Sequence, residues 1–432
     1  MLESDNTKKN FYIFLILFSV TLYVLGFIFN EDSAGGGKID FNNTWNNQKI
    51  FDENSLSKSL ENTKSSKILP FKNSHFPTSY ILNKYLNPFS INKEAFRQSI
   101  FILNLFLPLL LFYALKNIFR KENIYLLAAY SSILYLSPYF RTSAYWSSLE
   151  NYGLYCLIIS IYFFSKYKNC IEYKEKIHLK NIYISLMSFF SCGCVYFDQK
   201  LLLIPLIYFA FLVKFEKNTN SKVLYFILNF IFAIPVISLV LYWGSIIPPH
   251  TTNTRGIGNF YFEQIGYSIS IIFFYLIPYI LIYYKKIIKE FNFNKIFILY
   301  LISLISILLI LYFIDHDYGG WDDYGKGWLH KLALKIFENS TYQKIFTYIL
   351  FFITIVISIN ILKREKIIIF FVFYMCGISI LSNPIFQEYF DPLVFIMLSS
   401  FFYKNNELNN NFVITAYLFS LFFLIFTNIY YL

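Results

Sequence analysis

The length of its apolar segments is the feature that most constrains how this chain can fold. Residues 11–29 form an apolar run, and a helix of about 20 such residues crosses a lipid bilayer. Similar runs recur along the whole chain, which is 56% hydrophobic and only 15% charged. Because a bilayer core holds no water, the backbone groups of each run must be bonded within the segment, as they are in a helix. The sequence therefore predicts an all-α polytopic membrane protein.

We predict about 11 to 14 transmembrane helices, in a single integral membrane domain that comprises residues 1–432. The first apolar run lacks a small-residue cleavage site and is followed by acidic residues, so we expect a retained span. The predicted spans are residues 11–29, 97–117, 124–140, 149–165, 181–197, 200–214, 223–246, 266–284, 296–314, 344–362, 367–382, 390–403 and 412–431.

The positions of the basic residues predict an orientation in the membrane. Cytoplasmic connections are enriched in Lys and Arg, and here alternate connections carry these residues, which places the N-terminus in the cytoplasm. The basic connections hold Lys8 and Lys9, Arg120 and Lys121, and the lysines and arginines of 166–180, 214–222, 285–295 and 363–366. Most of the net charge of +11 is thus explained by basic residues that mark the cytoplasmic connections. We expect membrane lipids as partners, and no nucleic acid.

The other connections hold nearly all the carboxylates, histidines, tryptophans and glycines outside the basic loops. We therefore expect any chemistry on the non-cytoplasmic face. The longest of these connections is 30–96, where Leu56, Leu60 and Tyr80 indicate short amphipathic helices at the membrane interface. The second large non-cytoplasmic loop is 315–344.

Two adjacent carboxylates, Glu31 and Asp32, follow the first predicted span directly. Gly35, Gly36 and Gly37 should stop the helix and let the backbone approach a ligand closely. An acidic pair at a membrane surface suits a base that must meet a lipid-borne substrate. The alternative interpretation is a polar helix end followed by a flexible turn.

Polar residues also flank the predicted spans that follow. His75, just before Phe76 and Pro77, could orient a phosphate or a hydroxyl, or could only hydrogen-bond the backbone. Arg141 and Glu150 flank an aromatic turn, which either forms a cavity wall or caps a helix within the interfacial aromatic belt. A charge at a span end, such as Glu150, is costly unless it is paired or faces a polar cavity.

Lys200, His250 and Arg255 carry donors that could hold a phosphate. Lys200 follows Asp198 in a tight connection, where the two charges could instead neutralise each other. His250 and Arg255 come after two prolines that end a long span. The alternative for that segment is a solvated basic loop.

The loop of residues 315–328 interleaves four carboxylates with Trp, Tyr and Gly. Sugar sites use such a mixture, because aromatic faces cover the apolar faces of sugar rings and carboxylates accept from hydroxyls. The candidates are Asp317, Trp321, Asp322 and Asp323. The sequence assigns no certain cofactor, and closely spaced Asp residues could bind a divalent cation such as Mg²⁺ or Mn²⁺. Glu388 lies at the mouth of a later span.

The five cysteines lie in or next to predicted spans. Without nearby His ligands, we interpret them as small hydrophobic residues and assign no metal site to them.

The order of these features resembles the GT-C class of membrane glycosyltransferases, which use polyprenyl-phosphate sugars as donors. An acidic pair after the first span, here Glu31-Asp32, is the motif of that class. The layout is most similar to the dolichyl-phosphate-glucose-dependent alpha-1,2-glucosyltransferase family. Short motifs of that family are similar to residues 75–80, 197–199, 244–250, 315–318 and 384–392. The chain has Asp198 and Glu388 where that family has Arg.

The resemblance implies inverting transfer of a hexose from a polyprenyl-phosphate sugar to a lipid-linked or surface glycan on the non-cytoplasmic face. Asp32 is the first candidate for the general base and Glu31 the second. The candidates for donor-phosphate binding are Lys200, His250, Arg255, His75 and Arg141. The candidates for sugar or acceptor binding are Trp321, Asp322, Asp323, Asp317 and Glu388.

Two other functions remain open on the sequence. A polysaccharide polymerase or ligase would depend more on external arginines than on the acidic pair. A lipid-linked glycan transporter, or flippase, would place charges deep within its spans, and this chain has few there. The abundance of Ile, Lys and Asn and the compact loops favour a bacterial inner membrane over an endoplasmic reticulum.

Overall fold

A computed structural model gives the arrangement of most of the chain. It describes residues 2–68, 70–173, 177–249, 260–290, 298, 302, 305–306, 325–362, 365–381, 385–402 and 408–431. Within these ranges the regular elements are helices and no strand occurs. This confirms the predicted all-α class.

Six helical stretches are long and apolar enough to cross a membrane. Their length and composition support a polytopic membrane protein, and the shorter apolar helices 124–136 and 366–379 accompany them. The six stretches are Asn6–Ile28, Lys93–Ile118, Thr219–Trp243, Gln264–Lys289, Thr341–Leu362 and Asn410–Tyr431.

The chain forms two compact units. Unit 1 comprises Met1–Thr252 together with Tyr417–Leu432, and unit 2 comprises Asn253–Ala416. The sequence predicts one integral membrane domain and does not indicate this division. The candidate residues Glu31, Asp32, His75, Arg141 and Lys200 all belong to unit 1.

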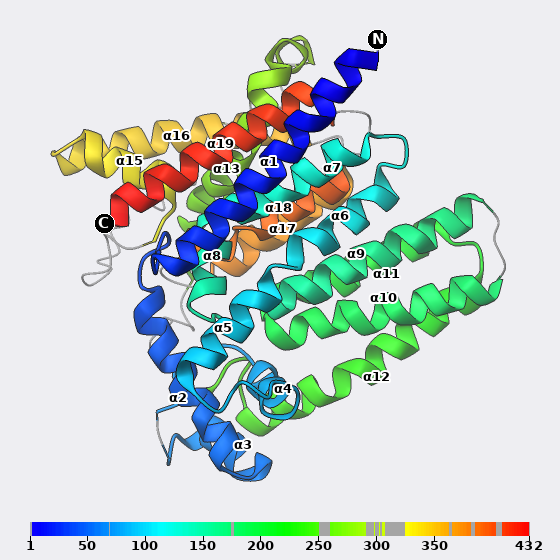
Figure 1. The fold of residues 1–432 in the computed structure, drawn as a ribbon, viewed down its shortest axis with the longest axis vertical. Coiled ribbons are helices and arrows are strands. Elements are labelled where there is room, and N and C mark those ends of the chain that lie inside the picture. The colour runs from blue at the N-terminus through cyan, green and yellow to red at the C-terminus, as the bar shows by residue number, and fades with distance from the viewer. Residues whose placement is uncertain are drawn as a thin grey trace. The chain divides into compact units, whose positions relative to one another are not determined.

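Unit 1 contains a group of antiparallel helices that pack in chain order. The helices α9 (Asn151–Glu172), α10 (Ile177–Phe197), α11 (Leu203–Phe215) and α12 (Thr219–Trp243) follow one another with short connections. Helix α10 packs on both α9 and α12, as Figure 1 shows. Aromatic stacking joins the neighbours, for example between Phe163 of α9 and Phe190 of α10 at 5.9 Å between ring centroids.

The long connection after α1 (Leu2–Ile28) is mostly helical. It contains α2 (Gly37–Glu53), α3 (Leu56–Ser65) and α4 (Thr78–Leu86). Helices α3 and α4 lie where Leu56, Leu60 and Tyr80 predict short helices. Helix α2 was not predicted, because its composition is polar, but Phe41, Trp45 and other residues spaced three to four apart bury one face of it.

The segment between α4 and α9 consists of shorter helices. These are α5 (Lys93–Asn104), α6 (Leu107–Ile118), α7 (Ile124–Ser131), the 3-10 helix η1 (Ser132–Leu136) and α8 (Pro138–Tyr145). The aromatic turn predicted around Arg141 is instead helix α8. It forms because Ser137 accepts a hydrogen bond from the Phe140 N–H as N-cap and Pro138 occupies the first helical turn.

The positions of the connections in unit 1 are described with reference to two of its ends. One end is basic: Lys9 lies over the ring of Tyr125 and Arg120 over that of Tyr173, at 5.1 Å and 4.9 Å from the centroids. At the other end Phe76 stacks on Trp243 at the close of α12, with 5.5 Å between centroids. We call these the basic end and the acidic-pair end, since Glu31 and Asp32 follow α1 at the latter (Figure 1).

Unit 2 is built around α13 (Gln264–Glu290), which packs against α16 (Ser340–Leu362) and α17 (Lys366–Ser379). Its core includes Ile269, Ile355, Val356 and Cys376. The described part of this unit also contains the short helices α15 (Trp328–Ile336), η5 (Gln387–Tyr389), α18 (Leu393–Met397) and η6 (Leu398–Phe402). Helix α19 (Asn410–Tyr431) begins in unit 2 and continues into unit 1.

Candidate functional site

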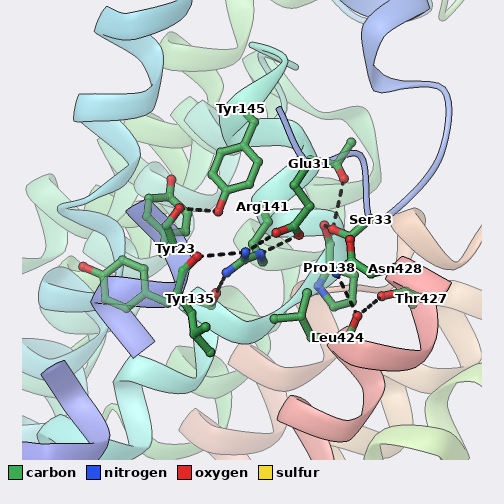
Figure 2. A network of polar contacts seen from close by, with 12 residues as sticks. Tyr23, Glu31, Ser33, Tyr135, Pro138, Arg141, Tyr145, Leu424, Thr427 and Asn428 are labelled. Carbon is green, nitrogen blue, oxygen red and sulfur yellow. Dashed lines mark hydrogen bonds and ion pairs between the residues drawn. The ribbon is translucent and has the colours of Figure 1, made fainter. Parts of the chain in front are cut away.

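The acidic pair lies in a tight turn between α1 and α2, and its first member is held by a buried cation. Figure 2 shows the guanidinium of Arg141 facing the carboxylate of Glu31. Arg141 Nε donates to Glu31 Oε1 at 2.8 Å, and Nη2 donates to Oε2. The side chain of Arg141 is 2% exposed and that of Glu31 12%. This is a bidentate ion pair, the strongest geometry that the two groups can form.

Backbone carbonyls also accept hydrogen bonds from the Arg141 guanidinium. Nη1 donates to the carbonyl of Tyr135 and Nη2 to that of Leu22, both at 3.0 Å. Helix α1 makes room for the pair at Gly26, where an added Cβ would lie 2.3 Å from Arg141 Nη2 and 2.4 Å from Glu31 Oε2. Glycine is therefore required at this point of α1 by the close approach of the ion pair.

Asp32 is engaged differently, by backbone rather than by a cation. Its Oδ1 accepts from the Gly37 N–H at 3.1 Å and its Oδ2 from the Lys38 N–H at 3.4 Å. These are the first N–H groups of α2, which have no partner inside the helix. Asp32 is partly exposed, and within the described part of the chain it makes no ion pair.

A cavity of about 400 Å³ opens beside this turn. Basic and aromatic side chains line it: Lys38, Phe41, Asn42, Lys93, Glu94, Arg97 and Trp146. The indole of Trp146 joins the cavity to the acidic pair, because its Nε1 donates to the Glu31 carbonyl at 2.8 Å. Lys38, whose N–H reaches Asp32, lies over the Trp146 ring at 5.6 Å from its centroid.

Sequence reasoning missed the basic members of this cavity. A usable signal exists, because Asn92 caps α5 by accepting from the Ala95 N–H, and a four-residue spacing then places Lys93 and Arg97 on the same helix face. Their position beside Lys38 and Trp146 has no local signal, since it depends on how α5 packs against α8 and α2.

The candidates His75 and Lys200 lie in a second polar cluster of unit 1. His75 Nε2 lies 3.0 Å from Glu150 Oε1, and Nδ1 lies 3.0 Å from Gln199 Oε1. Burial lowers the pKa of His75, but the hydrogen bond and charge of Glu150 and the charge of Asp198 outweigh it, so the net pKa is raised. Lys200 Nζ pairs with Asp198 Oδ2 at 3.2 Å, as the neutralisation alternative predicts.

These contacts bring three sequence-distant connections to one place. His75 comes from residues 30–96, Glu150 precedes α9 and Gln199 lies between α10 and α11. The sequence predicts all three on the same side of the membrane. The structure gathers them at the acidic-pair end of unit 1.

In unit 2, Glu388 is exposed on η5. Its charge raises the pKa of the buried Lys331, but burial dominates and lowers that pKa to about 8. The adjacent His330 is also buried and lies 3.2 Å from the Thr347 hydroxyl, and burial lowers its pKa to about 3. The sequence did not single out either residue, because one buried face of a short amphipathic helix carries no specific chemical signal.

The remaining candidates lie outside the described residues. They are His250 and Arg255, and the acidic-loop residues Asp317, Trp321, Asp322 and Asp323, together with the divalent-cation hypothesis for that loop.

Comparison of the chain with models of known families, with characterised proteins and with solved structures gave no significant match. The functional case therefore depends on the motifs of the sequence and the geometry described above.

Proposed function

We propose that this protein is a membrane glycosyltransferase of the GT-C type, which transfers a hexose from a polyprenyl-phosphate sugar to a lipid-linked or surface glycan. The observation that carries the proposal is the different bonding of the two adjacent carboxylates. Glu31 is fixed by Arg141, whereas Asp32 is partly exposed and bonded only by backbone N–H groups among the described residues. Glu31 thus has a positioning role, and Asp32 is the general base.

The proposed reaction is a single displacement. Asp32 takes the proton from an acceptor hydroxyl, and the oxygen attacks the anomeric carbon of the donor. The bond from that carbon to the phosphate oxygen breaks with inversion, and polyprenyl phosphate leaves with the bonding electron pair. Because negative charge grows on the phosphate, nearby cations stabilise the transition state.

The position of Asp32 fits a substrate that lies in the membrane surface. It follows α1, whose residues Asn6–Ile28 are long and apolar enough to span a bilayer. We propose that the acidic-pair end faces the non-cytoplasmic side of a bacterial inner membrane, in line with the basic residues at the opposite end. The partners would be a polyprenyl-phosphate sugar and a lipid-linked glycan.

The test is transfer of radiolabelled sugar from polyprenyl-phosphate glucose, mannose or galactose in membranes that carry wild type or Asp32→Asn. Asn can still accept from the Gly37 N–H but cannot take a proton, so we expect loss of transfer by about 100-fold or more with normal expression. Glu53→Gln, an exposed carboxylate of α2, is the matched control and should transfer normally.

A fully active Asp32→Asn would show that Asp32 is not the base. Absence of labelled product with every donor, in wild type as well as variant, would contradict glycosyl transfer itself. Movement of the lipid-linked sugar across proteoliposomes without product would then identify a transporter.

A further inference from the structure

The cavity beside Asp32 carries more positive charge than its own side chains neutralise. Lys38, Lys93 and Arg97 contribute three cations, and Glu94 is the one carboxylate in the lining. Glu94 Oε1 lies 3.5 Å from Arg97 Nη1, and its side chain is 59% exposed. Solvent screens so exposed a carboxylate, so it offsets little of the charge of the cavity.

Arg97 is the fixed element of this cavity. Its side chain is 8% exposed, its Nε donates to the Tyr145 carbonyl at 2.7 Å, and its guanidinium lies 4.3 Å from the Trp146 ring centroid and 4.5 Å from that of Phe27. The buried Nη2 has no hydrogen-bond partner among the described residues. A buried guanidinium donor without an acceptor is costly, so a ligand oxygen that bonded to it would remove that cost.

The two lysines are exposed and lie on two different helices. Lys38 belongs to the first turn of α2 and lies over Trp146. Lys93 belongs to the first turn of α5, lies 5.1 Å from the Phe41 centroid and donates to Asn42 Oδ1. The partial positive charge of the α5 N-terminus adds to theirs. Three cationic groups thus converge from two helices on one space of about 400 Å³.

The arrangement of the three cationic groups favours a phosphate ligand over a carboxylate ligand. A planar guanidinium with two point-charge ammonium groups matches an oxyanion that presents oxygens in several directions. Phe41 and Trp146 supply an apolar wall next to these charges, which suits a ligand whose phosphate is attached to a hydrocarbon chain. The backbone N–H of Lys38, whose side chain lies over Trp146, donates to Asp32 Oδ2 at 3.4 Å.

We propose that this cavity binds the phosphate of a polyprenyl-phosphate ligand, with Arg97 Nη2 as the fixed donor and Lys38 and Lys93 as the closing cations. The proposal depends on the proposed function for the class of ligand. It adds residues that the sequence did not identify. It also places the phosphate beside Lys38, whose backbone N–H donates to Asp32, the base that the displacement requires.

The experiment measures binding of radiolabelled farnesyl phosphate to the purified full chain in phosphatidylcholine nanodiscs. Lys38→Gln and Lys93→Gln should each weaken binding about fivefold to tenfold, because each removes a charge-assisted contact. Glu94→Gln should tighten it about twofold to fivefold, because a competing carboxylate is lost. Lys49→Gln, which removes an exposed cation of α2 outside the lining, should bind as wild type.

The lysine variants should weaken binding and Glu94→Gln should tighten it. These opposite effects distinguish a role in ligand binding from a role in folding. Folding damage would lower binding in all four variants, whereas only a ligand anion in the cavity predicts tighter binding for Glu94→Gln. Unchanged binding in both lysine variants would overturn the proposal. So would equal displacement of the label by farnesol, since that alcohol lacks the phosphate.

Competitors distinguish the sources of phosphate. Much stronger competition by unlabelled farnesyl phosphate than by inorganic phosphate supports a lipid-linked ligand. Equal competition by inorganic phosphate also supports a phosphate site, and it assigns the site to a water-soluble ligand. Displacement by phosphatidylglycerol in the nanodisc at similar occupancy would overturn the polyprenyl assignment.

Failure of this proposal is distinguishable from failure of the proposed function. If Asp32→Asn binds farnesyl phosphate normally but no donor supports transfer in wild type, phosphate binding by the cavity is supported and the glycosyltransferase assignment is contradicted. If transfer occurs and depends on Asp32 but the lysine variants bind normally, the cavity assignment alone falls.

Discussion

Arg141 and Glu31 form the most completely buried ion pair among the described residues. Each charge has lost its water and is compensated only by the other and by two carbonyls. Removing one partner leaves an uncompensated charge in a medium of low polarity, whereas removing both leaves none. The stability of the turn that holds Asp32 therefore depends on the pair as a unit.

We expect Arg141→Met to lower the free energy of unfolding by about 3 to 5 kcal/mol. The double variant Glu31→Gln with Arg141→Met should lose less, because no charge is then buried alone. Thermal unfolding in detergent, followed by the loss of the monodisperse peak, measures the effect. Arg120→Met, an exposed cation at the basic end, is the control, and equal melting temperatures for the two single Arg variants would contradict the prediction.

His75 gives unit 1 a pH-dependent contact. Glu150 and Asp198 raise its pKa above the ordinary value in spite of burial. A histidine whose pKa is higher in the folded state stabilises the fold fully below its unfolded pKa of about 6.5, and this contribution is lost as the pH rises through the raised folded value.

The difference in melting temperature between wild type and His75→Gln should therefore be largest near pH 6 and should shrink by about pH 9. His178→Gln, which alters an exposed histidine of α10, should show no such trend. A difference that grows with pH would mean that His75 is neutral in the folded protein at every pH measured.

At the scale of the elements, the start of α2 is the point where the fold and the site meet. Gly35 and Gly36 have φ of +75° and +85°, a region that only glycine adopts freely. Gly37 is buried, and an added Cβ would lie 2.5 Å from the Trp146 ring and 2.7 Å from Thr142 Cγ2. Trp146 can therefore reach the Glu31 carbonyl only because residue 37 has no side chain.

Gly37→Ala should lower the free energy of unfolding by about 1 to 3 kcal/mol, since Trp146 must shift to avoid overlap. The same variant should weaken binding of farnesyl phosphate, because Trp146 forms the wall of the cavity. Gly377→Ala, in α17 with open space around its Cβ position, should be neutral or slightly stabilising. Wild-type stability of Gly37→Ala would contradict the close approach.

At the scale of the whole molecule, the predicted topology assigns the two ends of unit 1 to opposite sides of the membrane. Lys9, Arg120 and their aromatic partners mark the basic end. His75, Glu150 and Gln199 gather at the acidic-pair end. Helices that alternate in direction across a bilayer place connections in this way.

Substituted cysteines should test this arrangement in a background without the five native cysteines. Lys58→Cys in α3 should react with a membrane-impermeant maleimide in intact bacterial cells, and Lys121→Cys only after permeabilisation. Both positions are exposed, so equal access to reagent is expected once the membrane is opened. Labelling of both from the same side would contradict the topology.

Much of the fold could be predicted because its causes are local. Apolar runs of span length fold as helices wherever lipid surrounds them, and α3 and α4 lie where Leu56, Leu60 and Tyr80 predict them. Helix α8 was missed, although Ser137 and Pro138 are ordinary helix-start residues, because the aromatic residues around Arg141 were interpreted as an interfacial turn.

The candidate site was predicted only in part. Glu31 and Asp32 were identified, since their position after the first span is readable in the chain, and Arg141 was named for a different role. Arg97, Lys38 and Lys93 were missed, because nothing near them in the sequence records which carboxylates and rings they will meet.

The sequence by itself determined that the chain is a helical membrane protein and where its first acidic pair lies, because span length and backbone hydrogen bonding act within single segments. Only the tertiary structure decided which charges are paired. Glu31 meets a guanidinium 110 residues away, Asp32 meets the N-terminus of α2, and Arg97, a lining residue of the cavity, keeps a buried donor without a partner among the described residues. Electrostatic pairing falls off over a few ångströms, so it is fixed by which helices pack together.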